Sequence, residues 1–299
     1  MRQAVAVSLS RRQLLAGAIS VGAAGAAGGV ALGVPAVRHR LDEIVHPIPE
    51  PSYSMPPARD ASVVSGSFVS RARVGRTVGW TIAYPEGSAR DLPVAIVLHG
   101  RSNDHATVFG SHLWGRYLTA TVAAGTPPFA VAAVDGGNHT YWHRRRDGDD
   151  PQLMLLTEFV PLLAQHGVRT RKLGLAGWSM GGYGALLLAE RIGSAQCAVV
   201  AVDSPALWRR PADTAPGAFD NAADFRSHDV LASRANLAGI PIRIAIGTSD
   251  PFYETTRLLV SELTPRPVTD FSRGGHDIAF WRHSAPAQLA FLGEHLRDV

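Results

Sequence analysis

The chain has 299 residues, of which 46% are hydrophobic and 18% charged, so it can bury a large core, and no repeat or low-complexity tract divides it into further domains. Its net charge of +4 comes almost entirely from scattered arginines, with Lys172 the single lysine, and the absence of a basic stripe interleaved with aromatic residues excludes nucleic acid as an expected partner. The lone Cys197 excludes an intramolecular disulfide, and its apolar neighbours predict a buried thiol.

Residues 1–37 are predicted to be an export signal. The run Ser10-Arg-Arg-Gln-Leu-Leu15 precedes an uncharged stretch, rich in Ala, Gly and Val, that ends at Val37. This pattern resembles a twin-arginine signal. Val34-Pro-Ala36 offers a cleavage site with small residues, whereas the uncut stretch is about long enough to span a bilayer and act as a membrane tether. Both alternatives predict an exported protein, in the cell envelope or outside the cell.

Residues 38–60 are predicted to be an extended, stiff tether, because they contain Pro47, Pro49, Pro51, Pro56 and Pro57. The remaining residues, 61–299, are expected to form a single domain. It opens with β-forming runs at Val63–Val69 and Thr77–Tyr84, which flank a turn at Gly75-Arg76 and predict an antiparallel hairpin.

The pattern then changes to short runs that are apolar on both faces, as buried parallel strands require: Val94–Leu98, Phe129–Val134, Lys172–Ala176, Ala198–Val202 and Ile242–Ile246. Helix-like segments lie between them. One begins at Asp150-Pro151, where Asp can cap and Pro fits the first turn, and another ends near Gly193. This alternation predicts an α/β fold whose mostly parallel sheet is flanked by helices, with the hairpin as an antiparallel N-terminal addition.

The most informative motif follows the run Lys172–Ala176 and reads Gly177-Trp-Ser179-Met-Gly181. An apolar strand that breaks into Gly-x-Ser-x-Gly and continues as an Ala/Leu-rich helix is typical of a nucleophile elbow. Gly177 and Gly181 would allow close backbone packing, while Ser179 would be held in a strained conformation with its hydroxyl exposed.

Residues that follow the other strands supply partners for Ser179. Asp250 comes after the last apolar run and His276 lies in a glycine-rich loop before the final helix, so the chain order is Ser, Asp, His, as in α/β-hydrolases. In this arrangement His276 removes the serine proton and Asp250 orients the imidazole. Asp203, directly after another strand, is the competing acid, and Asp277 is interpreted as a helix cap.

The backbone amides of Arg101 and Met180 are expected to form an oxyanion hole, with Gly100 permitting the close approach. No cofactor and no metal is expected, because phosphate-binding glycine motifs and His-Glu-x-x-His are absent, and the candidate ligands lack suitable spacing: His99, His105, His112 and Asp147–Asp150.

Taken together, residues 61–299 resemble the esterase D-like branch of serine α/β-hydrolases, which contains S-formylglutathione hydrolases, feruloyl and acetyl-xylan esterases and secreted mycolyltransferases. The motifs that carry this resemblance are Leu98-His-Gly-Arg101, Tyr141-Trp142, Glu158-Phe-Val-Pro161, Gly177–Gly184, Ser249-Asp250, Gly275-His276 and Phe280-Trp281. The resemblance implies an α/β-hydrolase fold and ester hydrolysis through an acyl-enzyme on Ser179. No thiol-ester-specific feature is evident, and an exported location argues against glutathione chemistry.

The expected substrate is therefore a small-molecule, lipid or carbohydrate ester, and its identity and acyl-chain length stay open. Two alternatives remain beside the hydrolase: an acyltransferase of the mycolyltransferase kind, in which an envelope hydroxyl replaces water, and a catalytically idle fold retained for binding. Tyr141, Trp142, His143 and the irregular segment 206–232, with Trp208 and Phe219, either line the pocket or simply pack as aromatic residues. The oligomeric state stays open.

Overall fold

The computed structural model describes residues 59–87 and 91–299, so the predicted signal and nearly all of the predicted tether lie outside the described residues. Both stay predictions, as does the boundary of the catalytic domain. In the part that is described, no helix combines the length and the apolar character needed to cross a membrane.

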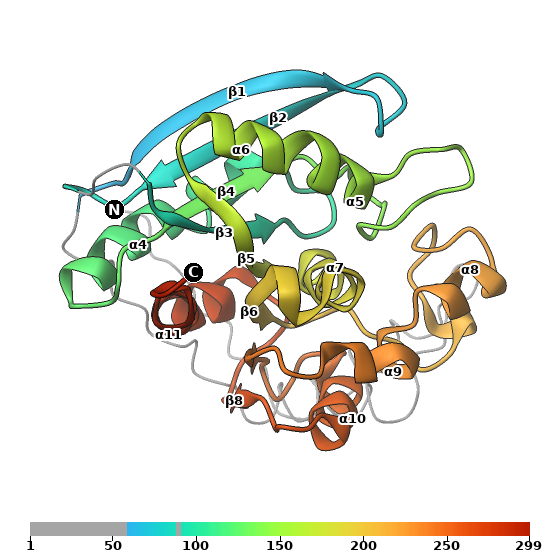
Figure 1. The fold of residues 1–299 in the computed structure, drawn as a ribbon. Coiled ribbons are helices and arrows are strands. Elements are labelled where there is room, and N and C mark those ends of the chain that lie inside the picture. Colours follow the sequence, from blue (N-terminus) through green and yellow to red (C-terminus); the bar gives the residue numbers. More distant parts are fainter. Residues whose placement is uncertain (1–58, 88–90) are drawn as a thin grey trace, which may run out of the picture. The chain divides into compact units, whose positions relative to one another are not determined.

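The described residues form one eight-stranded sheet in the order β1-β2-β4-β3-β5-β6-β7-β8 (Figure 1). The pairs β1–β2 and β2–β4 are antiparallel, and every other neighbouring pair is parallel. The strands are β1 (Ser62–Ser70), β2 (Arg76–Tyr84), β3 (Pro93–Leu98), β4 (Ala130–Val134), β5 (Arg169–Trp178), β6 (Cys197–Asp203), β7 (Ile242–Ala245) and β8 (Val268–Asp270). The predicted mostly parallel sheet with an antiparallel N-terminal hairpin is therefore confirmed.

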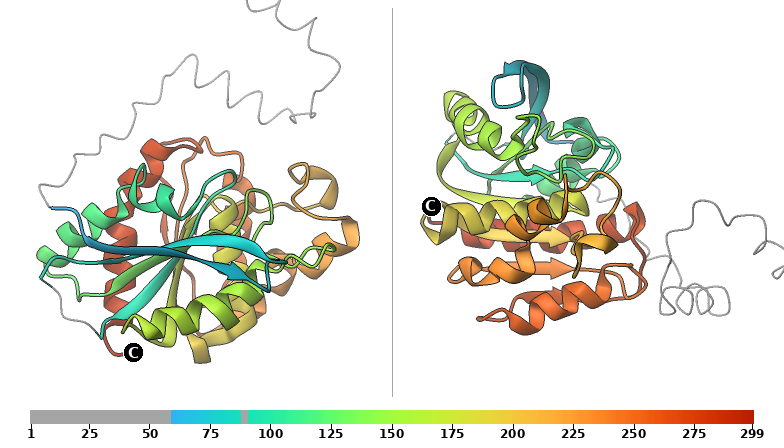
Figure 2. Two further views of the ribbon diagram at one scale, coloured as in Figure 1. Left: turned by 90° about the horizontal axis from the view of Figure 1, so that it is seen from above. Right: turned by 90° about the vertical axis from the view of Figure 1, so that its right-hand side faces the viewer.

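Helices cover both faces of the sheet, which is why the central strands are apolar on both sides. On one face, Val97 of β3 packs in a cluster with α4 and α11, whereas Ile96 faces a second cluster that includes residues of α5, α6 and α7. Figure 2 shows the two groups of helices on opposite sides of the strands. The helices are α3 (His105–Phe109), α4 (Trp114–Ala123), α5 (Pro151–Met154), η1 (Leu155–Phe159), α6 (Val160–Gln165), α7 (Met180–Gln196), α10 (Tyr253–Glu262) and α11 (Ile278–Leu296).

Local signals in the sequence account for several helix boundaries. The Asp150 carboxylate accepts a hydrogen bond from the Leu153 N–H, and Pro151 occupies the first turn of α5, as predicted. Gly193 has a φ of 62°, which breaks the helical path of α7 near its predicted end. The predicted buried thiol of Cys197 is also confirmed, since its side chain is buried at the start of β6 and burial raises its pKa to about 12.

The long connection between β6 and β7 is more regular than its sequence predicts. It contains η2 (Pro211–Asp213), α8 (Ala222–Ser227), α9 (Val230–Ser233) and η3 (Arg234–Leu237), and Figure 1 shows α8 at the periphery, away from the strands. Asn221 caps α8 by accepting hydrogen bonds from the N–H groups of Ala223 and Asp224, and Asp229 caps α9 in the same way. We call residues 204–241 the β6–β7 insertion.

Candidate active site

Ser179 lies at the sharp turn between β5 and α7. Its backbone has φ 54° and ψ −119°, a conformation that residues other than glycine rarely adopt. A Cβ at Gly181 would overlap the carbonyl group of Leu98, and one at Gly177 would lie 2.6 Å from that same carbonyl oxygen. The glycines of the motif are thus required by the close approach of the elbow to the end of β3, as the sequence predicts.

The structure brings Ser179, Asp250 and His276 together at the carboxyl ends of the parallel strands. The Nε2 atom of His276 is 2.9 Å from the Ser179 Oγ atom, and its Nδ1 atom is 2.7 Å from the Asp250 Oδ2 atom. The Asp250 side chain is fully buried, whereas that of His276 is 25% exposed. The N–H of Phe252 donates to the other Asp250 oxygen over 2.9 Å, which fixes the carboxylate orientation. This arrangement can move a proton from the serine hydroxyl to the imidazole.

The competing acid, Asp203, contacts α11, whereas His276 contacts Asp250. Its Oδ1 atom accepts hydrogen bonds of 2.6 Å from both Ser284 Oγ and Gln288 Nε2, which belong to α11. Burial raises the pKa of Asp203 to about 7, so this carboxyl group between β6 and α11 is protonated in a substantial part of the molecules at neutral pH. Asp277 caps α11 by accepting a hydrogen bond from the Phe280 N–H, as predicted.

The predicted oxyanion-hole residues flank the same turn. Met180 is the first residue of α7, and Arg101 lies three residues beyond the end of β3. Within residues 59–87 and 91–299, neither of their N–H groups has a backbone acceptor. The Arg101 side chain is exposed and donates to His139 Nδ1 over 2.8 Å. Free N–H groups at this turn can donate hydrogen bonds to an oxygen on which negative charge develops.

His99 is a site residue whose part the sequence did not indicate. Its ring is buried, its Nε2 atom accepts from the Gly136 N–H over 2.9 Å, and its Nδ1 atom lies 2.8 Å from the Gly100 carbonyl oxygen. Burial lowers the pKa of His99, which favours the neutral ring that these two contacts need. His99 thereby ties the loop that carries Arg101 to the loop after β4. The one signal in the sequence that could have indicated a role for His99 is its position directly after a strand.

Aromatic side chains extend from the triad toward the β6–β7 insertion. The His276 ring contacts that of Phe252 at 5.3 Å, and Phe252 contacts Trp208 at 5.4 Å between centroids. Trp208 contacts Tyr141 at 5.3 Å. Trp142 differs from these residues, because it is fully buried and packs against Gly184 and Gly136, where any Cβ would overlap its ring. For Trp142 the interpretation as a packing residue therefore holds.

The comparisons with known proteins agree on one fold. The structure is similar to a ferulic acid esterase (TM-score 0.67, 20% identity, covering 80% of this chain and 99% of that one). It is also similar to the S-formylglutathione hydrolase FrmB from Staphylococcus aureus (TM-score 0.65, 17% identity, 78% and 99%) and to MPT51 from Mycobacterium tuberculosis (TM-score 0.62, 16% identity, 81% and 99%). At these identities the likeness establishes the fold. No curated protein matches the chain.

The sequence itself matches a family. Residues 72–292 fit the model of the family described as "Putative esterase", a span that begins in the β1–β2 turn and ends in α11. It includes every residue of the elbow, the Asp250 loop and the His276 loop. The chain therefore belongs to this esterase family and has the α/β-hydrolase fold.

Proposed function

We propose that the chain is a serine carboxylic-ester hydrolase in which Ser179 is the nucleophile, His276 the general acid and base, and Asp250 the residue that orients His276. The observation that carries this proposal is the pair of contacts from His276, 2.9 Å to Ser179 Oγ and 2.7 Å to Asp250 Oδ2. Contacts of this length suit direct proton transfer between the serine and the imidazole.

The reaction follows from the geometry. Ser179 Oγ attacks the ester carbonyl carbon while His276 Nε2 takes the hydroxyl proton, and the imidazolium is stabilised by Asp250. Collapse of the tetrahedral intermediate breaks the bond to the alcohol, which leaves with the proton from His276. Water then attacks the acyl-enzyme and gives a proton to His276. The bond from the acyl carbon to Ser179 Oγ breaks, His276 returns the proton to Ser179 Oγ, and the acid is released. The N–H groups of Met180 and Arg101 stabilise the oxyanion in both halves, each by about 3 kcal/mol.

The acceptor in the second half decides between two activities. A hydroxyl group of an envelope sugar or lipid that replaces water would make the chain an acyltransferase with the same triad. The His276 side chain is 25% exposed, so an acceptor from solution can reach its ring. Competition between water and added alcohols separates the two, because a transferase forms the new ester at the expense of free acid.

The test is hydrolysis of p-nitrophenyl esters, from acetate to long acyl chains, by the wild type, Ser179→Ala and the exposed-serine control Ser67→Ala. Ser179→Ala is expected to lower kcat by at least about 10⁴-fold, whereas Ser67→Ala keeps it. A fluorophosphonate probe is expected to label the wild type and the control only. A folded wild type that neither turns over any ester nor reacts with the probe would leave the idle binding fold as the better account.

The proposed place of action is outside the cytoplasm, and the support for it is the paired Arg11 and Arg12 before an uncharged stretch. Replacing both arginines by lysine is expected to retain the protein inside cells that export the wild type. Fractionation followed by immunodetection measures this. Equal export of the double variant would contradict a twin-arginine route.

A further inference from the structure

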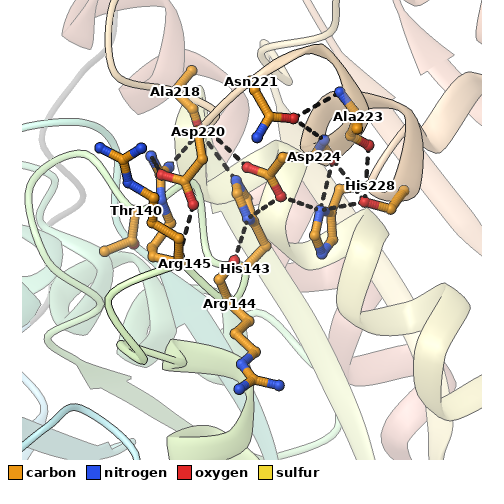
Figure 3. A network of polar contacts seen from close by, with 12 residues as sticks. Thr140, His143, Arg144, Arg145, Ala218, Asp220, Asn221, Ala223, Asp224 and His228 are labelled. Carbon is orange, nitrogen blue, oxygen red and sulfur yellow. Dashed lines mark hydrogen bonds and ion pairs between the residues drawn. The ribbon is translucent and has the colours of Figure 1, made fainter.

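A second cluster of ionisable side chains lies beside the β6–β7 insertion. His143 comes from the loop between β4 and α5, while Asp224 and His228 lie four residues apart at α8, so their side chains share one face of this helix (Figure 3). Each of the three offers one ligand atom, and these atoms lie within 4.8 Å of one another. Two histidines and a carboxylate are a ligand set that zinc commonly uses in proteins.

The distances within the cluster suit one shared cation. The Asp224 Oδ1 atom lies 3.0 Å from His228 Nδ1 and 3.8 Å from His143 Nδ1. Two ligands of a tetrahedral zinc ion, each bound at about 2.1 Å, are separated by roughly 3.4 Å. The observed separations fall on either side of this value. Small movements of the exposed end of α8 would therefore complete the coordination.

The outer contacts of His143 are those of a metal ligand. Its Nε2 atom is 3.0 Å from the Ala218 carbonyl oxygen, and a proton on Nε2 would be donated there. Such a bond to a backbone carbonyl fixes the tautomer and leaves Nδ1 unprotonated, 3.8 Å from Asp224 Oδ1. Asp224 is oriented as well, because its Oδ2 atom accepts from the Asp220 N–H over 2.8 Å.

The ring nitrogens of His143 face more hydrogen-bond acceptors than a neutral imidazole can serve. The His143 side chain is 1% exposed, and besides the Ala218 carbonyl it faces the Arg144 carbonyl oxygen, 3.0 Å from Nδ1. A neutral ring has one proton and cannot donate to both carbonyls. With the proton on Nε2, the lone pair of Nδ1 meets two oxygen acceptors, the Arg144 carbonyl and Asp224 Oδ1.

Arg145 does not supply a positive charge to Asp224. Arg145 is bound to Asp220, with 2.8 Å between Nη2 and Oδ1, and its Nη1 atom donates to the Ala218 carbonyl oxygen. The Arg146 N–H donates to the second Asp220 oxygen over 2.7 Å. Asp220 thus pairs with this arginine segment, and the Asp224 Oδ1 atom is left to the two histidines (Figure 3).

We propose that His143, Asp224 and His228 bind one divalent transition-metal cation of the Zn²⁺ type, with water as the fourth ligand on the side of the partly exposed His228. The expectation from the sequence was that no metal is bound. It rested on spacing, and spacing cannot detect a site whose ligands come from two segments that meet only in the folded chain.

The position of this cluster indicates that a bound cation would stabilise the β6–β7 insertion. The His143 ring stacks on Phe219 at 5.0 Å, and the Tyr183 hydroxyl of α7 donates to the His228 carbonyl oxygen over 2.7 Å. Tyr183 is one turn along the helix that begins after Ser179. A cation would therefore clamp the insertion, with its aromatic side chains, against the elbow helix. This inference goes beyond the proposed ester hydrolysis and does not depend on it.

The test measures metal directly on the full-length chain, purified without a polyhistidine tag and treated with chelator. Titration with Zn²⁺ by calorimetry is expected to give one site per chain, and Co²⁺ in its place is expected to give the visible absorption of tetrahedral cobalt. At zinc concentrations about 100-fold above Kd, the Tm is expected to rise by about 5–10 °C.

Two variants and two matched controls identify the ligands. Asp224→Asn and His228→Gln are expected to weaken binding by about 100-fold or more and to abolish the cobalt absorption. His295→Gln is the control for the histidine, because His295 Nδ1 makes the same contact with a carbonyl four residues back, 2.9 Å to Phe291, without a carboxylate. Asp213→Asn is the control for the acid, because Asp213 lies in the same insertion and pairs with Arg210.

The outcomes are decisive in either direction. One-to-one binding that both ligand variants lose and both controls keep supports the site, whether or not the chain hydrolyses esters. A folded wild type without a one-to-one site, or variants that bind as the wild type does, would overturn the proposal.

Discussion

At the scale of single residues, the two buried acids next to the parallel strands behave differently because their partners differ. Asp250 accepts from the Phe252 N–H and faces His276, whereas Asp203 accepts from Ser284 and Gln288 of α11. Asp203 ends one strand and Asp250 follows another, so position along the chain did not separate them. The hydrogen-bond partners do.

We expect Asp250→Asn to lower kcat for ester hydrolysis by about 10⁴-fold, because an amide favours the wrong imidazole tautomer and cannot stabilise an imidazolium. Asp203→Asn is expected to keep kcat within a few fold. Steady-state kinetics on the two variants, with circular dichroism to check the fold, measures this difference. The opposite ranking would make Asp203 the acid of the triad.

Asp203 also predicts how stability depends on pH. Burial raises its pKa from an ordinary 3.8 to about 7, so between these values the folded chain holds a proton that the unfolded chain has released. Stability is therefore expected to fall as the pH rises from about 4 to 7 and to level off above that. Asp203→Asn stays neutral and should lose this part of the profile. Urea denaturation at several pH values checks it, and parallel profiles for the variant and the wild type would contradict it.

At the scale of secondary-structure elements, the site depends on how closely the β5–α7 elbow approaches the end of β3. Gly181 is the contact point, because a side chain there would meet the Leu98 carbonyl group, which is backbone and cannot move aside. The strained φ of 54° at Ser179 is held in place by this packing. The cost of such a conformation is about 1–3 kcal/mol, which the surrounding contacts offset.

Gly181→Ala is expected to lower the free energy of unfolding by about 3 kcal/mol, because the added methyl group overpacks the elbow. Gly193→Ala is the matched comparison in the same helix. No atom lies within 4 Å of its added Cβ, so only the backbone conformation, φ 62° and ψ 178°, resists the change, and a loss of about 1–2 kcal/mol is expected. Chemical denaturation measures both. Equal losses would mean that steric contact with β3 contributes little.

The sequence was sufficient for the strands and the elbow, because each buried strand is a continuous apolar run and Gly-x-Ser-x-Gly follows one of them. It missed β8, whose three residues Val268–Asp270 are exposed or half-buried and form no such run. It also treated the β6–β7 insertion as irregular, since α8 and α9 are too short to show a period. The contacts of His99 and His143 could not be predicted either, because their partners lie in segments that are distant in the sequence.

At the scale of the whole molecule, the hydrophobic core of residues 59–87 and 91–299 is built from the helices and strands of these same residues. The described residues all belong to one compact unit. We expect a chain that begins at Ile48 to keep the Tm within about 2 °C and the ester turnover of the full-length protein, because no buried cluster of the described residues needs the preceding segment. Thermal melting and kinetics on the truncated chain measure this. Loss of folding or of turnover would show that the first 47 residues contribute.

The triad also ties activity to the last stages of chain synthesis. Its Ser179–His276 contact joins residues 97 positions apart, and Asp250 follows β7, near the far edge of the sheet from β1. Contacts between such distant positions form late, after the loops between them have closed. A nascent chain that ends before His276 has no general base. Turnover recorded during refolding would therefore time the completion of the sheet, and comparison with the earlier recovery of helical circular dichroism would show how far the two events are separated.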